Sequence, residues 1–134
     1  MASFDLKNDV KQLLALNPQT IATSTTVVGN EIDTLGFQSL VFLPSIGTRT
    51  DGTFTIVVQD SDVSGSGFVD VVDDFLSGTE AAAAIITSNT IKRVGYVGKK
   101  RYVKCSMVST TVTSGSTSVQ IVAVLGNPNY SPVA

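Results

Sequence analysis

Residues 36–59 read GFQSLVFLPSIGTRTDGTFTIVVQ, and this stretch contains two runs of the kind that form β-strands. The first run places apolar side chains at Phe37, Leu40 and Phe42, and the second, TFTIVVQ, is rich in β-branched residues. Between them stands Asp51-Gly52, which is a strong tight-turn signal when strand-like runs flank it. We therefore predict that residues 36–45 and 53–59 pair as a β-hairpin.

Strand-like runs continue on both sides of this stretch. Residues 20–29 are β-branched almost throughout, and three further candidates occupy residues 89–98, 100–112 and 117–126. Short strands separated by frequent turns are typical of sandwiches, and the runs do not alternate with helices as in a parallel α/β sheet. The expected fold is all-β, an antiparallel β-sandwich or jelly-roll-like domain with a short N-terminal helix. The alanine run SGTEAAAAIITSNT, residues 77–90, fits either a short helix capped by Thr79 or a compact loop.

Residues 4–16, FDLKNDVKQLLAL, have apolar side chains at helical spacing. Asn17-Pro18 ends this helical pattern, because the residue before a proline is driven out of the α region. We predict an N-terminal helix or arm over residues 1–18 and a β-sandwich domain over residues 19–134. The helix either caps the core of its own domain or docks on a neighbouring subunit. The apolar side chains at helical spacing within FDLKNDVKQLLAL are Phe4, Leu6, Val10, Leu13 and Leu14.

The composition leaves little room for catalysis. The chain has 43% apolar and 15% charged residues, a formal net charge of −2, no histidine and a single cysteine. Without histidine the commonest general base and neutral metal ligand are missing, and one cysteine forms neither an internal disulfide nor a cysteine-based zinc site. We expect a non-enzymatic protein with no cofactor and no metal, in which Cys105 packs as a small buried side chain. So lightly charged a surface favours self-association or docking.

Neither a membrane nor a nucleic acid is an expected partner. The opening MASFDLKNDV lacks the basic and apolar segments of a signal peptide, and no apolar stretch approaches the ~20 residues of a membrane span. The net charge is not that of a nucleic-acid-binding domain. Gly95 and Gly98 lack the phosphate-loop pattern. Tyr96 and Tyr102 alternate with bases as on a single-strand-binding face, but we expect them to pack within a hairpin.

An acidic stretch at residues 59–74, QDSDVSGSGFVDVVDD, allows two interpretations. Read from Asp60 it matches the first half of a calcium-binding EF-hand loop, but a valine stands where a bidentate carboxylate is required. Read from Asp62 it has serines at the third and fifth ligand positions. A turn explains the stretch more simply, with positive φ at Gly65 and Gly67 and local capping by Asp60, Asp62 and Ser64.

Charge is also segregated along the sequence. Seven of the eleven acids lie between residues 51 and 80, and six of the nine bases lie between residues 92 and 104. The two segments either face each other within one sandwich, or form separate solvated faces, or join neighbouring subunits, since complementary charge sets register and partner choice. The candidate interface residues are Lys92, Arg93, Lys99, Lys100, Arg101, Lys104, Asp60, Asp62, Asp70, Phe4, Leu6 and Val10.

Four segments together resemble a family of small proteins of tailed bacteriophages and prophages. They are DLKNDVKQLLALNP, DTLGFQSLVFLPSIGTRTDGTFTIVVQDSD, IKRVGYVGKKRYVKC and VAVLGNPNYSPVA, in this order, and the resemblance runs from about Asp5 to Ala134. The family members are similar to virion components encoded near the major capsid protein. Members often have a longer SDDGS-like turn where this chain has SDVSGSG, and histidines where it has Asn127 and Asn129. A role for those histidines therefore does not transfer to this chain.

The resemblance implies a structural role in the phage head. The expected function is that of a capsid decoration or cement protein, made in the bacterial host cytoplasm and located on the capsid surface of the virion. Its expected partners are the major capsid protein and further copies of itself, as a dimer or trimer. Two alternatives stay open: a head–tail connector or tail-completion protein, and a carbohydrate-binding module displayed on the particle. The absence of tryptophan weighs against the sugar-binding alternative.

Overall fold

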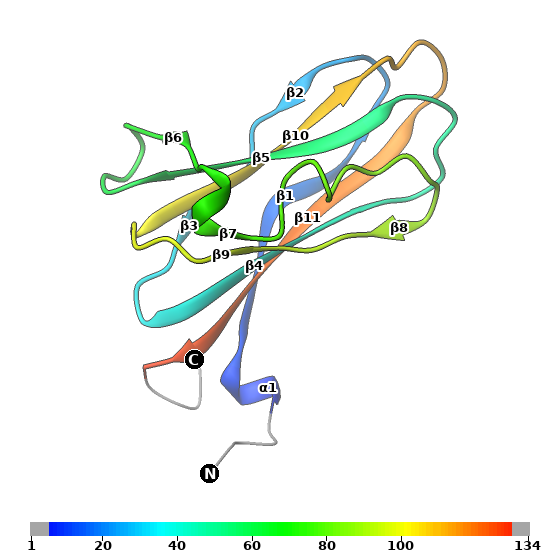
Figure 1. The fold of residues 1–134 in the computed structure, drawn as a ribbon. Helices are drawn as coiled ribbons and strands as arrows, with labels where there is room; N and C mark the ends of the chain where they lie inside the picture. The colour runs from blue at the N-terminus through cyan, green and yellow to red at the C-terminus, as the bar shows by residue number, and fades with distance from the viewer. Residues whose placement is uncertain (1–5, 130–134) are drawn as a thin grey trace.

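The computed structural model describes residues 6–129, which form a sandwich of two antiparallel sheets (Figure 1). Sheet A has the strand order β1-β11-β4-β9-β7, with β8 paired to β4, and sheet B has the order β2-β10-β5-β6, with β3 paired to β10. The strands of sheet A are β1 (Lys11–Ile21), β4 (Phe37–Ile46), β7 (Leu76–Ser77), β8 (Thr90–Ile91), β9 (Val94–Tyr96) and β11 (Thr117–Pro128). Those of sheet B are β2 (Thr26–Val27), β3 (Ile32–Asp33), β5 (Thr53–Ser61), β6 (Val69–Asp70) and β10 (Tyr102–Thr110). With the short helix α1 (Leu6–Asp9) and the 3-10 turn η1 (Asp73–Phe75), this architecture confirms the expected all-β sandwich.

One apolar core fills the space between the sheets. Every second side chain of β4, β5 and β11 is buried, which is the alternation expected of strands with one face on a core. Phe42 from sheet A and Phe54 from sheet B are both 0% exposed and are the largest of the fully buried side chains. Cys105 is also 0% exposed, so the prediction that it packs as a small buried side chain is confirmed.

The predicted hairpin between β4 and β5 is wrong. β4 lies in sheet A between β11 and β9, whereas β5 lies in sheet B between β10 and β6, so residues 47–52 carry the chain from one sheet to the other. Asp51 has a different role in this connection. Its Oδ2 accepts hydrogen bonds from the Thr113 N–H at 2.9 Å, the Thr113 hydroxyl at 2.6 Å and the Ser114 N–H at 3.0 Å. Asp51 thereby ties the β4–β5 connection to the loop between β10 and β11.

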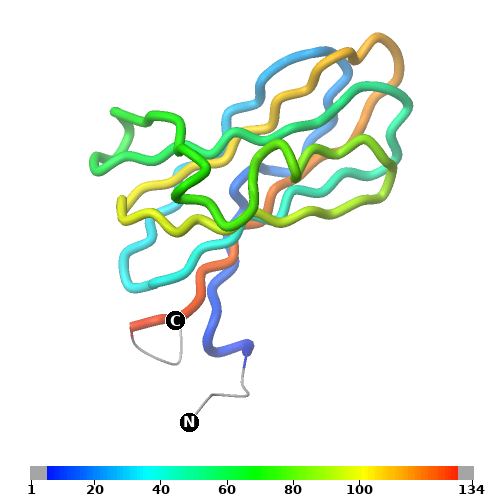
Figure 2. Tube along the Cα trace, viewed as in Figure 1, coloured from blue at the N-terminus to red at the C-terminus, as the bar shows by residue number. Residues whose placement is uncertain are grey.

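Two later connections cross between the sheets in the same way. β9 belongs to sheet A and β10 to sheet B, so the hairpin expected to contain Tyr96 and Tyr102 is also wrong. β11 then returns the chain to sheet A. The tube in Figure 2 shows these successive crossings. Such crossings are typical of sandwiches with Greek-key connections, in which neighbours in sequence are not always neighbours in a sheet.

The N-terminal helix is confirmed only over Leu6–Asp9, and its predicted continuation to residue 16 is wrong. β1 begins at Lys11 and pairs with β11 along the edge of sheet A, running through the point at residue 18 where we divided the chain. Its register shifts between Leu14 and Leu16, and Ala15 and Leu16 are both buried. A bulge turns neighbouring side chains to the same side, so the apolar spacing of this strand imitates that of a helix.

The alanine run forms the compact loop rather than a helix. Thr79 Oγ1 accepts a hydrogen bond from the Ala82 N–H at 3.0 Å, so the capping contact predicted for Thr79 is present. Ile85 then forms an isolated bridge with Phe54 of β5, which fastens the loop across the open side of sheet B. The loop therefore closes the side of the sandwich between β6 and β8.

Candidate interaction surfaces

The acidic and basic segments meet inside one molecule at a buried contact between the sheets. The Tyr96 hydroxyl donates to Asp60 Oδ2 at 2.7 Å and accepts from the Lys100 N–H at 3.1 Å. Tyr96 is 5% exposed and Asp60 7%, and the Lys100 ammonium lies 4.0 Å from Asp60 Oδ1. Burial, and next the hydrogen bond to Asp60, raises the pKa of the Tyr96 hydroxyl. The tyrosine ring occupies the space that a side chain at Gly98 would need, which explains the glycine there.

Two more residues of the basic segment also have partners within the chain. Arg101 donates to both carboxylate oxygens of Asp33, from Nε to Oδ1 and from Nη2 to Oδ2, each at 2.8 Å. This bidentate contact holds the pKa of Asp33 below its usual range and raises that of Arg101. The Lys104 ammonium lies 4.4 Å from the centre of the Phe68 ring, which stands just before β6 in the acidic stretch of residues 59–74.

The acidic stretch is the turn of the β5–β6 hairpin, in which Gln59 pairs with Asp70. Gly65 and Gly67 have φ of +81° and +74°, so the positive φ predicted for both is confirmed. The capping groups differ from those expected, since the turn is closed by Ser61, whose Oγ donates to the Ser66 carbonyl at 2.6 Å. Asp60 instead binds Tyr96.

The Glu31 carboxylate holds this turn from outside the hairpin. It accepts hydrogen bonds from the Ser64 hydroxyl and the Gly65 N–H, both at 2.8 Å. Ser64 was expected to cap the backbone of the turn, but its hydroxyl donates to the Glu31 carboxylate instead. Within residues 6–129 no three histidine, cysteine, aspartate or glutamate side chains gather where they could hold a metal ion.

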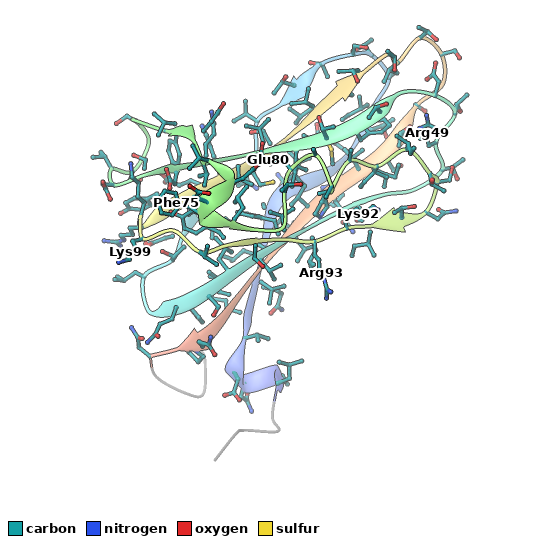
Figure 3. The ribbon with its side chains drawn as sticks, in the orientation of Figure 1. Arg49, Phe75, Glu80, Lys92, Arg93 and Lys99 are labelled. Carbon is teal, nitrogen blue, oxygen red and sulfur yellow. The ribbon has the colours of Figure 1, made fainter. Side chains whose placement is uncertain are left out.

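The remaining candidate interface residues are distributed over several parts of the surface. Lys92, Arg93, Lys99, Asp62, Asp70 and Leu6 are exposed, and Val10 is partly buried. Figure 3 shows Lys99 at the left of the view and Arg93 extending from the lower edge of the sandwich. Phe4 lies outside the described residues. The structure therefore places Lys100 beside Asp60 and Lys104 beside the β5–β6 hairpin. Arg93 lies at the lower edge of the sandwich, away from these two contacts (Figure 3).

The central part of the outward side of sheet A is apolar, which sequence reasoning missed, and Gln12, Gln120, Ser39 and Ser45 border it. Register places Leu14, Val122 and Leu43 in one row across β1, β11 and β4, and the next row contains Val124 and Val41. Leu14 is 45% exposed, and the other four are partly exposed. We call these five side chains the outer face of sheet A. The sequence does carry a sign of this face, because β4 and β11 each contain a run of consecutive apolar residues, 40–43 and 121–125. Such runs are typical of strands that are covered on both sides.

A shallow open depression of about 630 Å³ adjoins this face where β4 meets β9 and β7. Gly95 pairs with Val41 and with Ser77, so two small residues form part of its lining. Arg93 and Val97 also line it and are exposed. The depression therefore has a lining of mixed polarity, with Val41 and Val97 beside Gln38, Ser39 and Ser77 and one guanidinium group.

A second exposed apolar cluster lies on the acidic side of the molecule. Residues 62–75 carry four apolar side chains that are at least half exposed, and we call this segment the acidic knob. Its other exposed residues include Asp62, Asp70, Asp73 and Asp74. The exposed apolar side chains are Val63 at 58%, Val69 at 55%, Val72 at 58% and Phe75 at 50%.

Two titratable groups near the core have raised pKa values, Cys105 and Glu80. Burial raises the pKa of the Cys105 thiol, which keeps the thiol protonated and unreactive. Glu80 Oε1 accepts a hydrogen bond from the Val58 N–H at 2.6 Å, at the edge of β5 where the Val71 N–H, just after β6, donates to the Val58 carbonyl. Burial raises the pKa of Glu80. Next to burial, the nearby charges of Asp70 and Asp73 in the acidic knob also raise the pKa of Glu80.

Within residues 6–129 no helix has the length and apolarity needed to cross a membrane. No family model matches the chain, and a search of curated proteins finds no match. Among solved structures, the chain is similar to the CBM22-1–GH10 modules of the Clostridium thermocellum endo-1,4-β-D-xylanase 10B complexed with xylohexaose, at 12% identity and a TM-score of 0.38. This match covers 95% of the chain and 28% of the xylanase chain, so the chain spans well under half of that protein.

Proposed function

We propose that the chain is a non-enzymatic structural protein of a tailed-phage virion that decorates the capsid and stabilises the head through contacts between subunits. The observation that carries this proposal is the apolar outer face of sheet A, on which Leu14 is 45% exposed. Exposing apolar side chains to water is unfavourable, and exposed apolar patches on a folded protein mark interaction sites. The resemblance of residues 5–134 to small phage proteins supplies the class of partner.

The rest of the molecule supports the same role. The chain has no histidine, and its cysteine is 0% exposed, so its exposed chemistry is that of contact surfaces. A cement protein needs a rigid body that resists deformation, and long antiparallel pairs such as β4 with β11 supply one. Many copies on a symmetric shell turn a weak individual contact into strong overall attachment.

The test uses particles that lack this protein, from the phage or prophage that encodes it. Purified protein is added, and the temperature at which packaged DNA becomes accessible to a dye is measured. We expect the protein to bind the particles and to raise that temperature. A matched variant with Leu43→Thr and Val122→Thr on the outer face of sheet A should fold and bind less, because weaker contacts between neighbouring copies reduce multivalent attachment. Failure of the wild-type protein to bind the particles would contradict the decoration role.

A further inference from the structure

We propose that the acidic knob of one copy docks on the outer face of sheet A of a second copy, in a head-to-tail contact. This inference gives named surfaces to the self-association that the proposed function includes. It is tested on the purified protein alone, so its failure would leave capsid binding untouched. A repeated contact of this type closes a ring or extends a chain of subunits.

The two surfaces match in apolar character. The knob presents Val63, Val69, Val72 and Phe75, each at least 50% exposed. The side chains of the outer face of sheet A are not among those packed on the core, and Leu14 is 45% exposed. Joining the two removes apolar area from water on both partners, which is the main favourable contribution to association.

Their charges are complementary as well. Residues 62–75 contain four aspartates and no lysine or arginine. The strands of sheet A contain no aspartate or glutamate. Their single base, Lys11, pairs with buried Leu125 and so lies on the opposite side of the sheet from Leu14 and Val122. Arg93 adds a guanidinium group in the depression beside Val41. Opposite charge around an apolar contact steers the two partners and fixes their register.

The acidic knob is held in a fixed position beside sheet A, because β7 follows Phe75 directly. The Val97 N–H donates to the Phe75 carbonyl at 2.8 Å, and Glu31 holds the hairpin turn through Ser64 and Gly65. Figure 3 shows Phe75 at the left end of the sandwich and Arg93 at its lower edge, extending away. Because the knob is already fixed by these contacts, little ordering is needed when it docks on a second copy.

The experiment uses two variants and their mixture. The knob variant carries Asp73→Lys and Asp74→Lys, and the face variant carries Arg93→Glu and Leu43→Thr. Sedimentation velocity of the wild-type protein should show association that rises with concentration and weakens with salt. Each variant alone should sediment as a monomer, with a dissociation constant at least about tenfold higher than wild type. An equimolar mixture should form a one-to-one heterodimer, because each partner keeps one intact surface.

The control is Lys99→Glu, which reverses an exposed charge outside both surfaces and should associate like wild type. Circular dichroism checks that each variant is folded, and Phe75→Ser replaces the knob variant if it is not. A wild-type protein that stays monomeric at millimolar concentration would overturn the proposal. So would a mixture that stays monomeric, or variants that associate as strongly as wild type.

Discussion

Tyr96 of β9 and Asp60 of β5 join sheet A to sheet B through one buried hydrogen bond of 2.7 Å. Replacing Tyr96 by phenylalanine keeps the ring but leaves the Asp60 carboxylate without this donor. We expect the Tyr96→Phe variant to lose about 1–3 kcal/mol of unfolding free energy, the usual cost of a buried polar group left unsatisfied. Urea denaturation at pH 7 measures the loss.

The matched control is Tyr102→Phe. Its ring keeps the contact with the Arg101 guanidinium, 5.0 Å from the ring centre. Tyr102 is only partly buried, so this change should alter the unfolding free energy by less than about 0.5 kcal/mol. Equal losses in the two variants would contradict a special role for the Tyr96–Asp60 hydrogen bond.

The same hydroxyl predicts sensitivity to alkali. Burial raises the pKa of Tyr96 in the folded protein, whereas the unfolded chain ionises near its ordinary value of about 10. The contribution of Tyr96 to stability is therefore complete below about pH 10 and is lost as pH rises above it. We expect the stability difference between wild type and Tyr96→Phe to narrow between about pH 10 and pH 11.5. Thermal unfolding across that range checks this, and a constant difference would be the contrary result.

Asp51 predicts sensitivity to acid. Hydrogen bonds from Thr113, and next from Ser114, lower its pKa in the folded protein. A carboxyl group of this kind stabilises the fold above its unfolded pKa of about 3.9, and the contribution disappears as pH falls through the folded value. We expect Asp51→Asn to lower the melting temperature at pH 7 and to match wild type at the acid end of the titration. A deficit that does not change with pH would refute the assignment to charge.

For Glu80 we predict the opposite dependence of stability on pH from that of Asp51. Burial raises its pKa, so its contribution is present below its unfolded pKa of about 4.3 and is lost as pH rises through the folded value. Glu80→Gln should keep the bond to the Val58 N–H and remove this pH dependence with little loss of stability at pH 7. Glu80→Ala should cost about 1–3 kcal/mol, because the Val58 N–H loses its acceptor. Urea unfolding of the two variants separates these effects, and equal losses would argue against the hydrogen bond.

The structure shows that a charge reversal in the basic segment would affect the fold as well as an interface. The basic segment suggests a triple reversal of Lys99, Lys100 and Arg101, with the fold expected to stay intact. Arg101 binds Asp33 at two points, and Lys100 lies beside buried Asp60, so glutamate at both positions sets like charges together. We expect Lys100→Glu with Arg101→Glu to lower the melting temperature, and Lys99→Glu to leave it unchanged. Calorimetry at low and high salt distinguishes the two variants.

Most strands were predictable from the sequence, but their partners were not. The apolar alternation around Phe42 and Phe54 indicates a strand with one buried face, and both strands form. The alternation does not say which strand lies alongside. Asp51-Gly52 is typical of a hairpin turn, yet here Asp51 accepts hydrogen bonds from Thr113 and Ser114, far away in the sequence. A long-range contact of this kind has no local signature.

The N-terminal error has a similarly specific cause. A helix was expected through residue 16 because Leu13 and Leu14 follow Val10 at helical spacing. A bulge in β1 buries Ala15 and Leu16 together, which breaks the two-residue period of a strand. Asn30 stabilises the bulge, since its N–H donates to the Ala15 carbonyl at 2.6 Å. That partner lies too far along the sequence for a local pattern to reveal it.

The interaction surfaces were predictable only in part. The acidic segment was visible as a charge cluster, and its exposed apolar side chains from Val63 to Phe75 stand in the same stretch. The outer face of sheet A depends on register, because Leu14, Val122 and Leu43 come together only when β1, β11 and β4 pair. Charge alone pointed to Lys100 and Arg101, which bind carboxylates of their own chain.

The decoration role is tested most directly by counting copies of this protein against the major capsid protein in purified particles. A decoration protein that covers the shell occurs at about one copy for every one to three capsid subunits, because it follows the symmetry of the shell. We predict a ratio in that range. A ring at a single head–tail joint would hold only about a dozen copies or fewer. That result, or absence from the particles, would contradict the account.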